Sequence, residues 1–368
     1  MHYSQCILEI DLSKIRANYK ILSNICKNSE VASVVKANAY GLGIDKITKA
    51  LEQENCKSFF VASTEEAINL RKIVDSSANI FVLNGVFYND VNEFEKHNLI
   101  PVLNHLGQVE LWTDFTKKLA KKLPSALHID TGLNRLGMPD LEIQTLINRP
   151  QLLELLSLEY IMSHLSSSTE SDNPYNLEQL KRFKYYLQYF PNTKASLSNS
   201  NGIFLGTDYQ FDLVRSGASL YGINGSKPNI IMHNVLKLTA PIIQLKTIAS
   251  NSHVGYNMSF TTKNDTIVAT LPIGYADGYS RIFSNCGEVF IDGHIAPIIG
   301  KISMDLITID VTDVPSHKIF LGQKVEIIND YFTIDKIASI IGTIGYEILT
   351  LLHGPRFKRI YKNDTEHS

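Results

Sequence analysis

The sequence predicts an α/β protein in which a (β/α)8 barrel of the TIM type is followed by a mainly β C-terminal domain. Between residues 12 and 225, apolar runs of strand length alternate with amphipathic helical stretches, and eight such runs can be counted. No Gly-x-Gly-x-x-Gly turn follows the first of them, which disfavours a dinucleotide-binding fold. Beyond Asn224 the strands are closely spaced and separated by glycine, asparagine, aspartate and proline, which indicates a β domain.

A chain of 368 residues is longer than one typical domain and can bury two hydrophobic cores. We expect the barrel to span residues 12–225 and the β-rich domain to span residues 226–368. The segment Gly222–Asn229 is the predicted linker, because its glycine, asparagine and proline residues favour turns. A strand within residues 1–11 is expected to pack with the C-terminal domain.

The first helix is predicted over Leu12–Ile25, after a short strand at residues 6–10. Apolar residues recur along it at nearly helical spacing, and Asp11 or Ser13 can cap its first turn. The elements predicted next are the barrel strands 31–35, 58–62, 79–83, 100–103, 126–130, 155–162, 195–197 and 212–215 and, among the helices, Thr64–Val74 and His105–Leu119. The elements predicted in the C-terminal domain are the strands 235–248, 266–272, 287–291, 295–299, 306–310 and 324–328 and the helix Ile334–Ile341.

Charge and composition exclude several kinds of partner. The chain carries 35 basic and 37 acidic residues with no basic block, so nucleic acid is not an expected partner. No apolar run approaches the roughly 20 residues of a membrane span, and the N-terminal segment lacks a signal-peptide core, so we expect a cytoplasmic protein that does not bind membranes. The four cysteines lack paired spacing, so neither a metal site nor a disulfide framework is expected.

The segment Val31–Gly43, VASVVKANAYGLG, carries the strongest chemical signal. Its β-branched run predicts a buried strand, and Lys36 lies where that strand meets a loop. Partial desolvation lowers the pKa of a lysine in such a place, and the neutral amine can form a Schiff base. The alternative is a lysine that only leads the strand into solvent, which is what an isolated Val-Val-Lys sequence would predict.

Other polar residues are predicted at the same end of the barrel, because active sites of these barrels lie at the C-terminal ends of the strands. They are Asp130 and Arg135, His164, Asn199 and Ser200, and Arg215 with Ser216 and Gly217. Each has a simpler interpretation: His164 as a core histidine, Arg215 as a surface partner of Asp212, and residues 198–202 as an ordinary turn. Together they predict one convergent site, in which small residues and backbone N–H groups can bind a phosphate.

Ten segments resemble the alanine racemases, a pyridoxal-phosphate-dependent family: LEIDLSKIRAN, VVKANAYG, HIDTGLNRLGM, IMSHLSS, SNSNGI, FDLVRSGASLYG, VGYNMSF, LPIGYADGYSR, PIIGKISMDL and GTIGYEILT. The resemblance implies that Lys36 holds the cofactor and that Tyr256 is the second catalytic base. The further cofactor residues that it implies are Tyr40, Arg135, His164, Asn199, Ser200, Arg215, Gly217, Ala218 and Tyr346. The substrate residues that it implies are Arg135, Tyr275, Met304 and Asp305.

The implied activity is the interconversion of L-alanine and D-alanine, which supplies D-alanine for peptidoglycan. Lys36 would serve one face of the substrate Cα and Tyr256 the other, and the family takes Tyr256 from the partner subunit of a homodimer. Arg215 would face the pyridine nitrogen and, as a permanent donor, keep it unprotonated. A related racemase for serine or for several amino acids is the alternative. A non-catalytic cofactor carrier is disfavoured by the β domain that contains Tyr256.

Two residues depart from the family pattern. Leu42 replaces the histidine of the usual KANAYGHG motif, so the role of that imidazole is absent. His128 replaces a lysine that many members carbamylate to orient the arginine equivalent to Arg135. We therefore expect Arg135 to be oriented by neutral His128, directly or through an anion, or by Asp130 or another acceptor if His128 points away.

Overall fold

The computed structural model describes residues 5–224, 230–352 and 356–363, and its chain divides into two compact units. One unit is Ile15–His233, and the other combines Met1–Lys14 with Asn234–Ser368. Residues 225–229 of the expected linker lie outside the described part.

The first unit is a barrel of eight strands, which confirms the predicted fold class. The strands are β2 (Glu30–Val34), β3 (Ser58–Val61), β4 (Asn79–Val82), β5 (Ile100–Leu103), β6 (Pro124–His128), β7 (Ser157–Met162), β8 (Lys194–Ser196) and β9 (Leu213–Ser216). The order β8-β7-β6-β5-β4-β3-β2-β9 follows the chain except that β9 pairs in parallel with β2. Strands β8 and β9 are the two ends of this strand order and do not form a regular ladder with each other. Two hydrogen bonds of 3.0 Å connect the chain there: Asp212 N–H donates to Ala195 O, and Arg215 N–H donates to Ser198 O.

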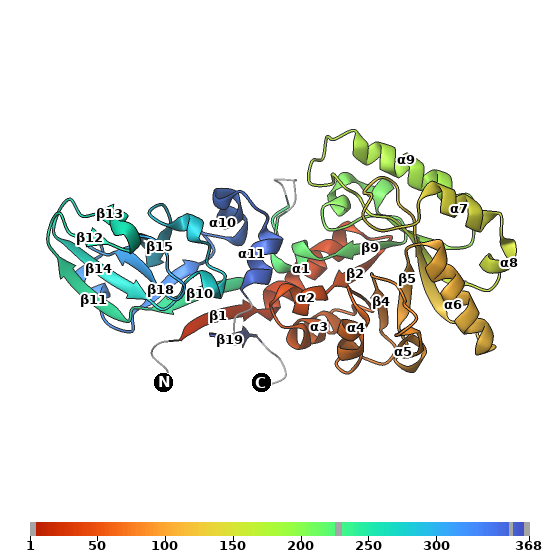
Figure 1. Ribbon diagram of the computed structural model, residues 1–368, viewed down its shortest axis with the longest axis horizontal. Coiled ribbons are helices and arrows are strands. Elements are labelled where there is room, and N and C mark those ends of the chain that lie inside the picture. The colour runs from red at the N-terminus through yellow and green to blue at the C-terminus, as the bar shows by residue number, and fades with distance from the viewer. Residues whose placement is uncertain (1–4, 225–229, 353–355, 364–368) are drawn as a thin grey trace. The chain divides into compact units, whose positions relative to one another are not determined.

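Helices cover the outside of these strands, as Figure 1 shows. They are α1 (Leu12–Ile25), α3 (Ile44–Glu52), α4 (Thr64–Arg71), α5 (Val91–Lys96), α6 (Leu106–Lys118), α7 (Asp140–Ile147), α8 (Pro150–Leu153) and α9 (Tyr175–Leu187). Each amphipathic helix turns its apolar stripe inward; in α3, for example, Ile47 and Leu51 are fully buried. Along the described residues, no helix is long and apolar enough to cross a membrane.

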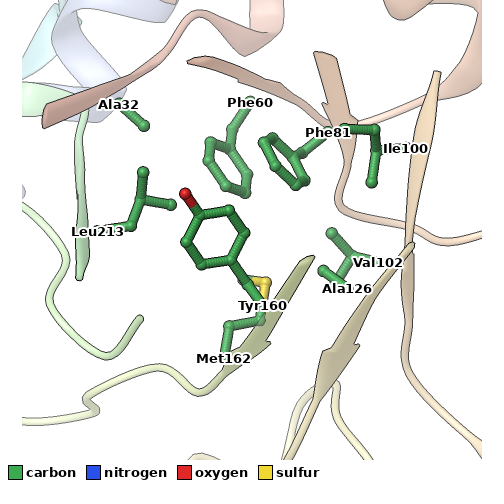
Figure 2. Packing of buried hydrophobic residues seen from close by; sticks show 9 residues of the cluster. All are labelled: Ala32, Phe60, Phe81, Ile100, Val102, Ala126, Tyr160, Met162 and Leu213. Carbon is green, nitrogen blue, oxygen red and sulfur yellow. The ribbon is translucent and has the colours of Figure 1, made fainter. Parts of the chain in front are cut away.

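Large apolar side chains fill the inside of the barrel (Figure 2). Phe60 and Phe81 stack with ring centroids 4.5 Å apart, and Tyr160 meets Phe81 edge to face at 5.7 Å. These rings come from β3, β4 and β7, where alternate residues point inward. The interior is therefore a packed core that supports a site at one end of the barrel.

The second unit is mainly β. Its six-stranded sheet has the order β16 (His294–Pro297), β15 (Glu288–Ile291), β18 (Lys324–Ile328), β10 (Leu236–Pro241), β1 (Cys6–Asp11) and β19 (Phe357–Lys362). One smaller sheet contains β11 (Gln244–Ile248), β14 (Thr266–Leu271) and β17 (Ile307–Asp310), and another contains β12 (His253–Val254) and β13 (Phe260–Thr261). The α-helices of this unit are α10 (Ile334–Ile341) and α11 (Gly345–Leu351). The N-terminal strand β1 pairs antiparallel with β10 and parallel with β19, so it belongs to this unit.

The predicted single strand 235–248 is wrong, because the chain changes sheets in its middle. Strand β10 ends at Pro241, which cannot donate to a sheet ladder. Ile242 N–H then donates to Gln323 O, and Ile243 N–H donates to Thr270 O on β14. Strand β11 continues from Gln244 in the other sheet. An unbroken apolar run does not reveal such a change of partner.

Candidate active site

Lys36 lies two residues after the end of β2 and is the first residue of an unusual turn, the segment α2 (Lys36–Tyr40). Ala37, Asn38, Ala39 and Tyr40 all have φ between 52° and 55°, so the segment is a left-handed helical turn. Such a conformation costs about 1–2 kcal/mol per residue for residues with a Cβ. Consecutive strained residues persist only where the surrounding structure holds them, and they cluster at functional sites.

Backbone hydrogen bonds hold this left-handed turn. Ala39 N–H donates to Val35 O at 2.9 Å, and Gly41 N–H donates to Ala37 O at 2.8 Å. The Asn38 carboxamide Oδ1 accepts from Ile44 N–H at 2.9 Å and so binds the first residue of α3. These bonds pair backbone groups of the turn within a few residues of the strand. Lys36, which carries the amine, is the first residue of this hydrogen-bonded turn.

One residue that holds this turn was not predicted from the sequence. The carboxylate of Glu66, in the first turn of α4, accepts from Ala37 N–H at 2.7 Å and from Ala62 N–H at 2.8 Å. The Ser63-x-x-Glu66 spacing is the signature of a capping box and could have drawn attention to it. A capping-box glutamate, however, bonds its own helix, whereas Glu66 joins the ends of two strands.

Tyr40, Ser200 and Gly217 come together beside the turn. Ser200 Oγ accepts from Gly217 N–H at 2.8 Å, and a Cβ placed on Gly217 would lie only 2.3 Å from the Tyr40 hydroxyl. Ala218 follows at the start of a short 3-10 helix, Ala218–Tyr221, and is buried. The Tyr40 and Ser200 hydroxyls therefore lie close to the Gly217 backbone, an approach that only glycine allows, and together these groups form a cradle that can bind an anion.

Arg215 is buried and lies near the C-terminal end of a barrel strand, within the predicted strand 212–215. It lies within β9, and its guanidinium donates to Ser196 Oγ, Ser163 O and Leu197 O. A buried guanidinium needs several acceptors, and the ends of the neighbouring strands supply them. Burial lowers the pKa of Arg215 to about 9, so it stays charged at neutral pH.

The simpler interpretation of Arg215 as a surface partner of Asp212 is wrong. The Asp212 carboxylate accepts from Ala195 N–H at 2.7 Å and so helps to hold β8 beside β9. Ordinary surface pairing therefore does not account for Arg215.

His164 lies two residues after β7 and is held as a neutral imidazole. Its Nε2 lies 3.4 Å from the Asn199 Nδ2, which can only donate. Burial lowers the pKa of His164 well below its ordinary value, and the nearby charge of Arg215 adds to this effect. Asn199 Oδ1 meanwhile accepts from Gly202 N–H at 2.9 Å and from the Ser168 hydroxyl. Asn199 thus orders the loop that carries Ser200.

Arg135 lies in the exposed loop after β6. Within the described residues its side chain makes no hydrogen bond or ion pair, although its charge acts on Lys36, His128 and His164. Asp130 does not hold it, because the Asp130 Oδ1 accepts from the backbone of the loop, beginning with Gly132 N–H at 2.8 Å. His128 does not bind it either, because its Nδ1 forms a hydrogen bond with Asn104 Oδ1.

The surroundings of Lys36 lower the pKa of its amine. Burial lowers its pKa, and the positive charge of Arg135 lowers it further, while the negative charge of Glu66 acts in the opposite direction. A neutral amine is the form that reacts with carbonyl carbon. The alternative of a lysine that only reaches solvent is therefore disfavoured.

The remaining predicted site residues belong to the β unit. Tyr256 opens a 3-10 turn, Tyr256–Met258, and is 66% exposed, and Tyr275 and Met304 are exposed as well. Asp305 is bound by Arg356, which also pairs with buried Asp277 at 2.7 Å. The half-buried Tyr346 lies in α11, where burial raises the pKa of its hydroxyl.

A barrel that carries a lysine amine, an anion cradle and a buried arginine at one end defines a class of enzyme with a lysine-bound cofactor. The family pattern described as "Alanine racemase, N-terminal domain" matches residues 10–225 of the chain. The pattern described as "Alanine racemase, C-terminal domain" matches residues 235–361. The chain therefore belongs to the alanine racemase family.

Full-length relatives and solved structures agree with this assignment. The chain is 60% identical over 358 residues to the alanine racemase of Rickettsia akari, covering 97% of this chain and 99% of that protein. The crystal structure of alanine racemase from Bartonella henselae with covalently bound pyridoxal phosphate has a TM-score of 0.93 at 41% identity, covering 97% and 99% of the two chains. The alanine racemase structure from Streptomyces lavendulae has a TM-score of 0.91 at 26% identity, covering 99% and 98%.

Proposed function

We propose that this protein interconverts L-alanine and D-alanine and that it depends on pyridoxal phosphate. One observation carries the proposal: Lys36 is the first residue of a left-handed turn that also contains Tyr40, whose hydroxyl lies with Ser200 and Gly217 in the cradle. The membership of the whole chain in the alanine racemase family supports it further. A racemase of this family that acts on serine or on several amino acids is the second candidate.

The residues of the barrel fit the cofactor. The cradle would hold its phosphate, with Ala218 at the start of the adjacent 3-10 helix, and Lys36 would hold it through its amine. Neutral His164 and charged Arg215 would line the ring, while Arg135 would contact the cofactor and the substrate. When bound, pyridoxal phosphate supplies an electron sink for the charge that forms at the substrate Cα.

The chain itself then has to move protons and orient groups. Lys36, with its lowered pKa, would accept the Cα proton on one face and return it there in the reverse reaction. Arg215 would present a permanent donor to the cofactor ring without giving up its proton at neutral pH, which would limit the spread of negative charge from the substrate Cα into that ring. With the negative charge kept near Cα, the proton would return to Cα, and transamination would be disfavoured.

We propose that the second proton carrier is Tyr256 and that it acts from the partner subunit of a homodimer. The exposure of Tyr256, together with exposed Tyr275 and Met304 on the β unit, supports a surface that a second copy covers. The β-rich domain would thus provide the second base and the contacts of the dimer, with Asp305 and Tyr346 among its contributions to the site. The supply of D-alanine to peptidoglycan and the cytoplasmic location stay predictions.

The test is to incubate the purified protein with L-alanine, L-serine and L-lysine separately and to resolve the products on a chiral column. We expect D-alanine as the main product, and D-serine or D-lysine at a comparable rate would favour the second candidate. Borohydride should fix the cofactor on Lys36, as peptide mapping can show. Fixation on Lys301, or on any other lysine, would contradict the proposed role of Lys36.

A further inference from the structure

Glu66 lies on a helix but binds the ends of two strands. Its Oε1 accepts from Ala37 N–H, the peptide next to Lys36, and its Oε2 accepts from Ala62 N–H, which follows β3. The helix keeps its own cap, because Ser63 Oγ accepts from Glu66 N–H. Both carboxylate oxygens are therefore directed away from α4 and toward the site.

We propose that Glu66 is a positioning residue that holds the left-handed turn of Lys36 in place and supplies the negative charge facing its amine. This inference rests on the proposed function of Lys36. Bonds from backbone N–H groups to a carboxylate are charge-assisted and stronger than neutral ones. They can offset part of the strain of the four residues with positive φ that follow Lys36.

Three charged or titratable groups from different elements interact electrostatically with Lys36. Arg135 comes from the loop after β6, His164 from the loop after β7, and Glu66 from α4. His164 is neutral, and Arg135 is positive, so Glu66 supplies the negative charge in this set. Its loss should leave the amine among positive and neutral neighbours.

The first experiment compares wild type, Glu66→Gln and the matched control Glu65→Gln, which changes an exposed carboxylate in the same turn of α4. A glutamine keeps one acceptor but turns its amide nitrogen toward the other N–H group. We expect hydrogen exchange at Ala37 or Ala62 to be roughly tenfold faster in Glu66→Gln, and pyridoxal phosphate to bind roughly tenfold more weakly. Glu65→Gln should match wild type.

The second experiment measures the charge of Lys36 in the full chain without added cofactor. Competitive acetylation, read by mass spectrometry, gives the pH at which half of the Lys36 amine is reactive. Glu66→Gln should shift this midpoint to lower pH, because it removes the charge that raises the pKa of Lys36. Glu66→Asp keeps the charge but cannot reach both N–H groups, so it should keep the midpoint and lose exchange protection.

Equal exchange and an equal midpoint in Glu66→Gln and Glu65→Gln would overturn the proposal. If Glu66→Gln does not fold, the Glu66→Asp variant decides, and full protection of both amides in that variant would overturn the proposal. These measurements contain no racemisation step. A failure to form D-alanine would therefore refute the proposed function while leaving the role of Glu66 to be judged by exchange and acetylation.

Discussion

The Nδ1 atom of His128 lies 2.7 Å from the Oδ1 atom of Asn104, in the buried interior of the barrel. The Asn104 amide nitrogen donates to Leu83 O and Val102 O, both at 2.9 Å, so only its oxygen can face the histidine. His128 must therefore carry its proton on Nδ1, and its Nε2 is a hydrogen-bond acceptor. Burial, Arg215 and Arg135 lower the pKa of His128 to about 3, which keeps the ring neutral.

We predict that bicarbonate does not affect the racemase activity of the wild type. Carbamylation requires a lysine amine, and the described geometry places a fixed neutral imidazole at this position instead. The measurement is the initial rate with and without added bicarbonate at constant pH and ionic strength. A bicarbonate-dependent rate in the wild type would show that another lysine has taken over this role.

The variant His128→Lys provides the matched comparison. Its amine would lie near Arg135 and Arg215, whose charges favour the neutral form that carbon dioxide can modify. We expect its activity to be lower than that of the wild type and to rise with bicarbonate. A mass increase of one carboxyl group on this lysine would identify the cause.

A second prediction concerns stability at acidic pH. The pKa of His128 is near 6.5 in an unfolded chain and about 3 in the fold, so between these values the unfolded chain binds more protons. The free energy of unfolding should therefore decrease as the pH falls from about 6.5 toward 3, by at most about 1.4 kcal/mol per pH unit from this group. Urea unfolding across this range measures it.

The variant His128→Gln isolates that contribution, because glutamine can donate to Asn104 but does not titrate in this range. Its stability should change less with pH than that of the wild type, so the two curves should converge as the pH falls. Parallel curves would mean that His128 is protonated in the fold or that its pKa is not shifted.

The sequence predicted the barrel because buried parallel strands are continuous apolar runs, and these runs remain visible in one chain. It also predicted that Lys36 follows a strand. It did not predict the left-handed turn, since alanine at positions 37 and 39 has no preference for positive φ. Nor did it predict the roles of Glu66 and Asn104. A glutamate at a capping position and an asparagine at a strand end give the same sequence pattern whichever groups their side chains bind.

A third prediction tests the cradle. In Gly217→Ala the new Cβ would meet the Tyr40 hydroxyl at 2.3 Å, although the φ of −120° at this position suits any residue. We expect pyridoxal phosphate to bind roughly ten- to a hundredfold more weakly, since overpacking costs about 1–3 kcal/mol. Absorbance titration measures the binding. The control Gly107→Ala touches only the exposed ring of His105 and should bind as the wild type does.

The last prediction concerns the shared site. If Tyr256 acts on the cofactor that Lys36 of the other subunit holds, then Lys36→Ala and Tyr256→Phe are each inactive as homodimers. Mixing them after dissociation should restore activity, because each hybrid dimer has one site with both bases. Random exchange at equal concentrations makes half of the dimers hybrid, so activity should reach roughly a quarter of the wild-type value.

The control mixes Lys36→Ala with the double variant Lys36→Ala/Tyr256→Phe, which exchanges subunits but provides no Lys36. Subunit exchange is verified by mass spectrometry of chains that carry different tags. Full exchange without recovered activity would contradict a site that combines Lys36 and Tyr256 of different subunits. Measurable activity in the unmixed Tyr256→Phe protein would show instead that Tyr256 is not the required second base.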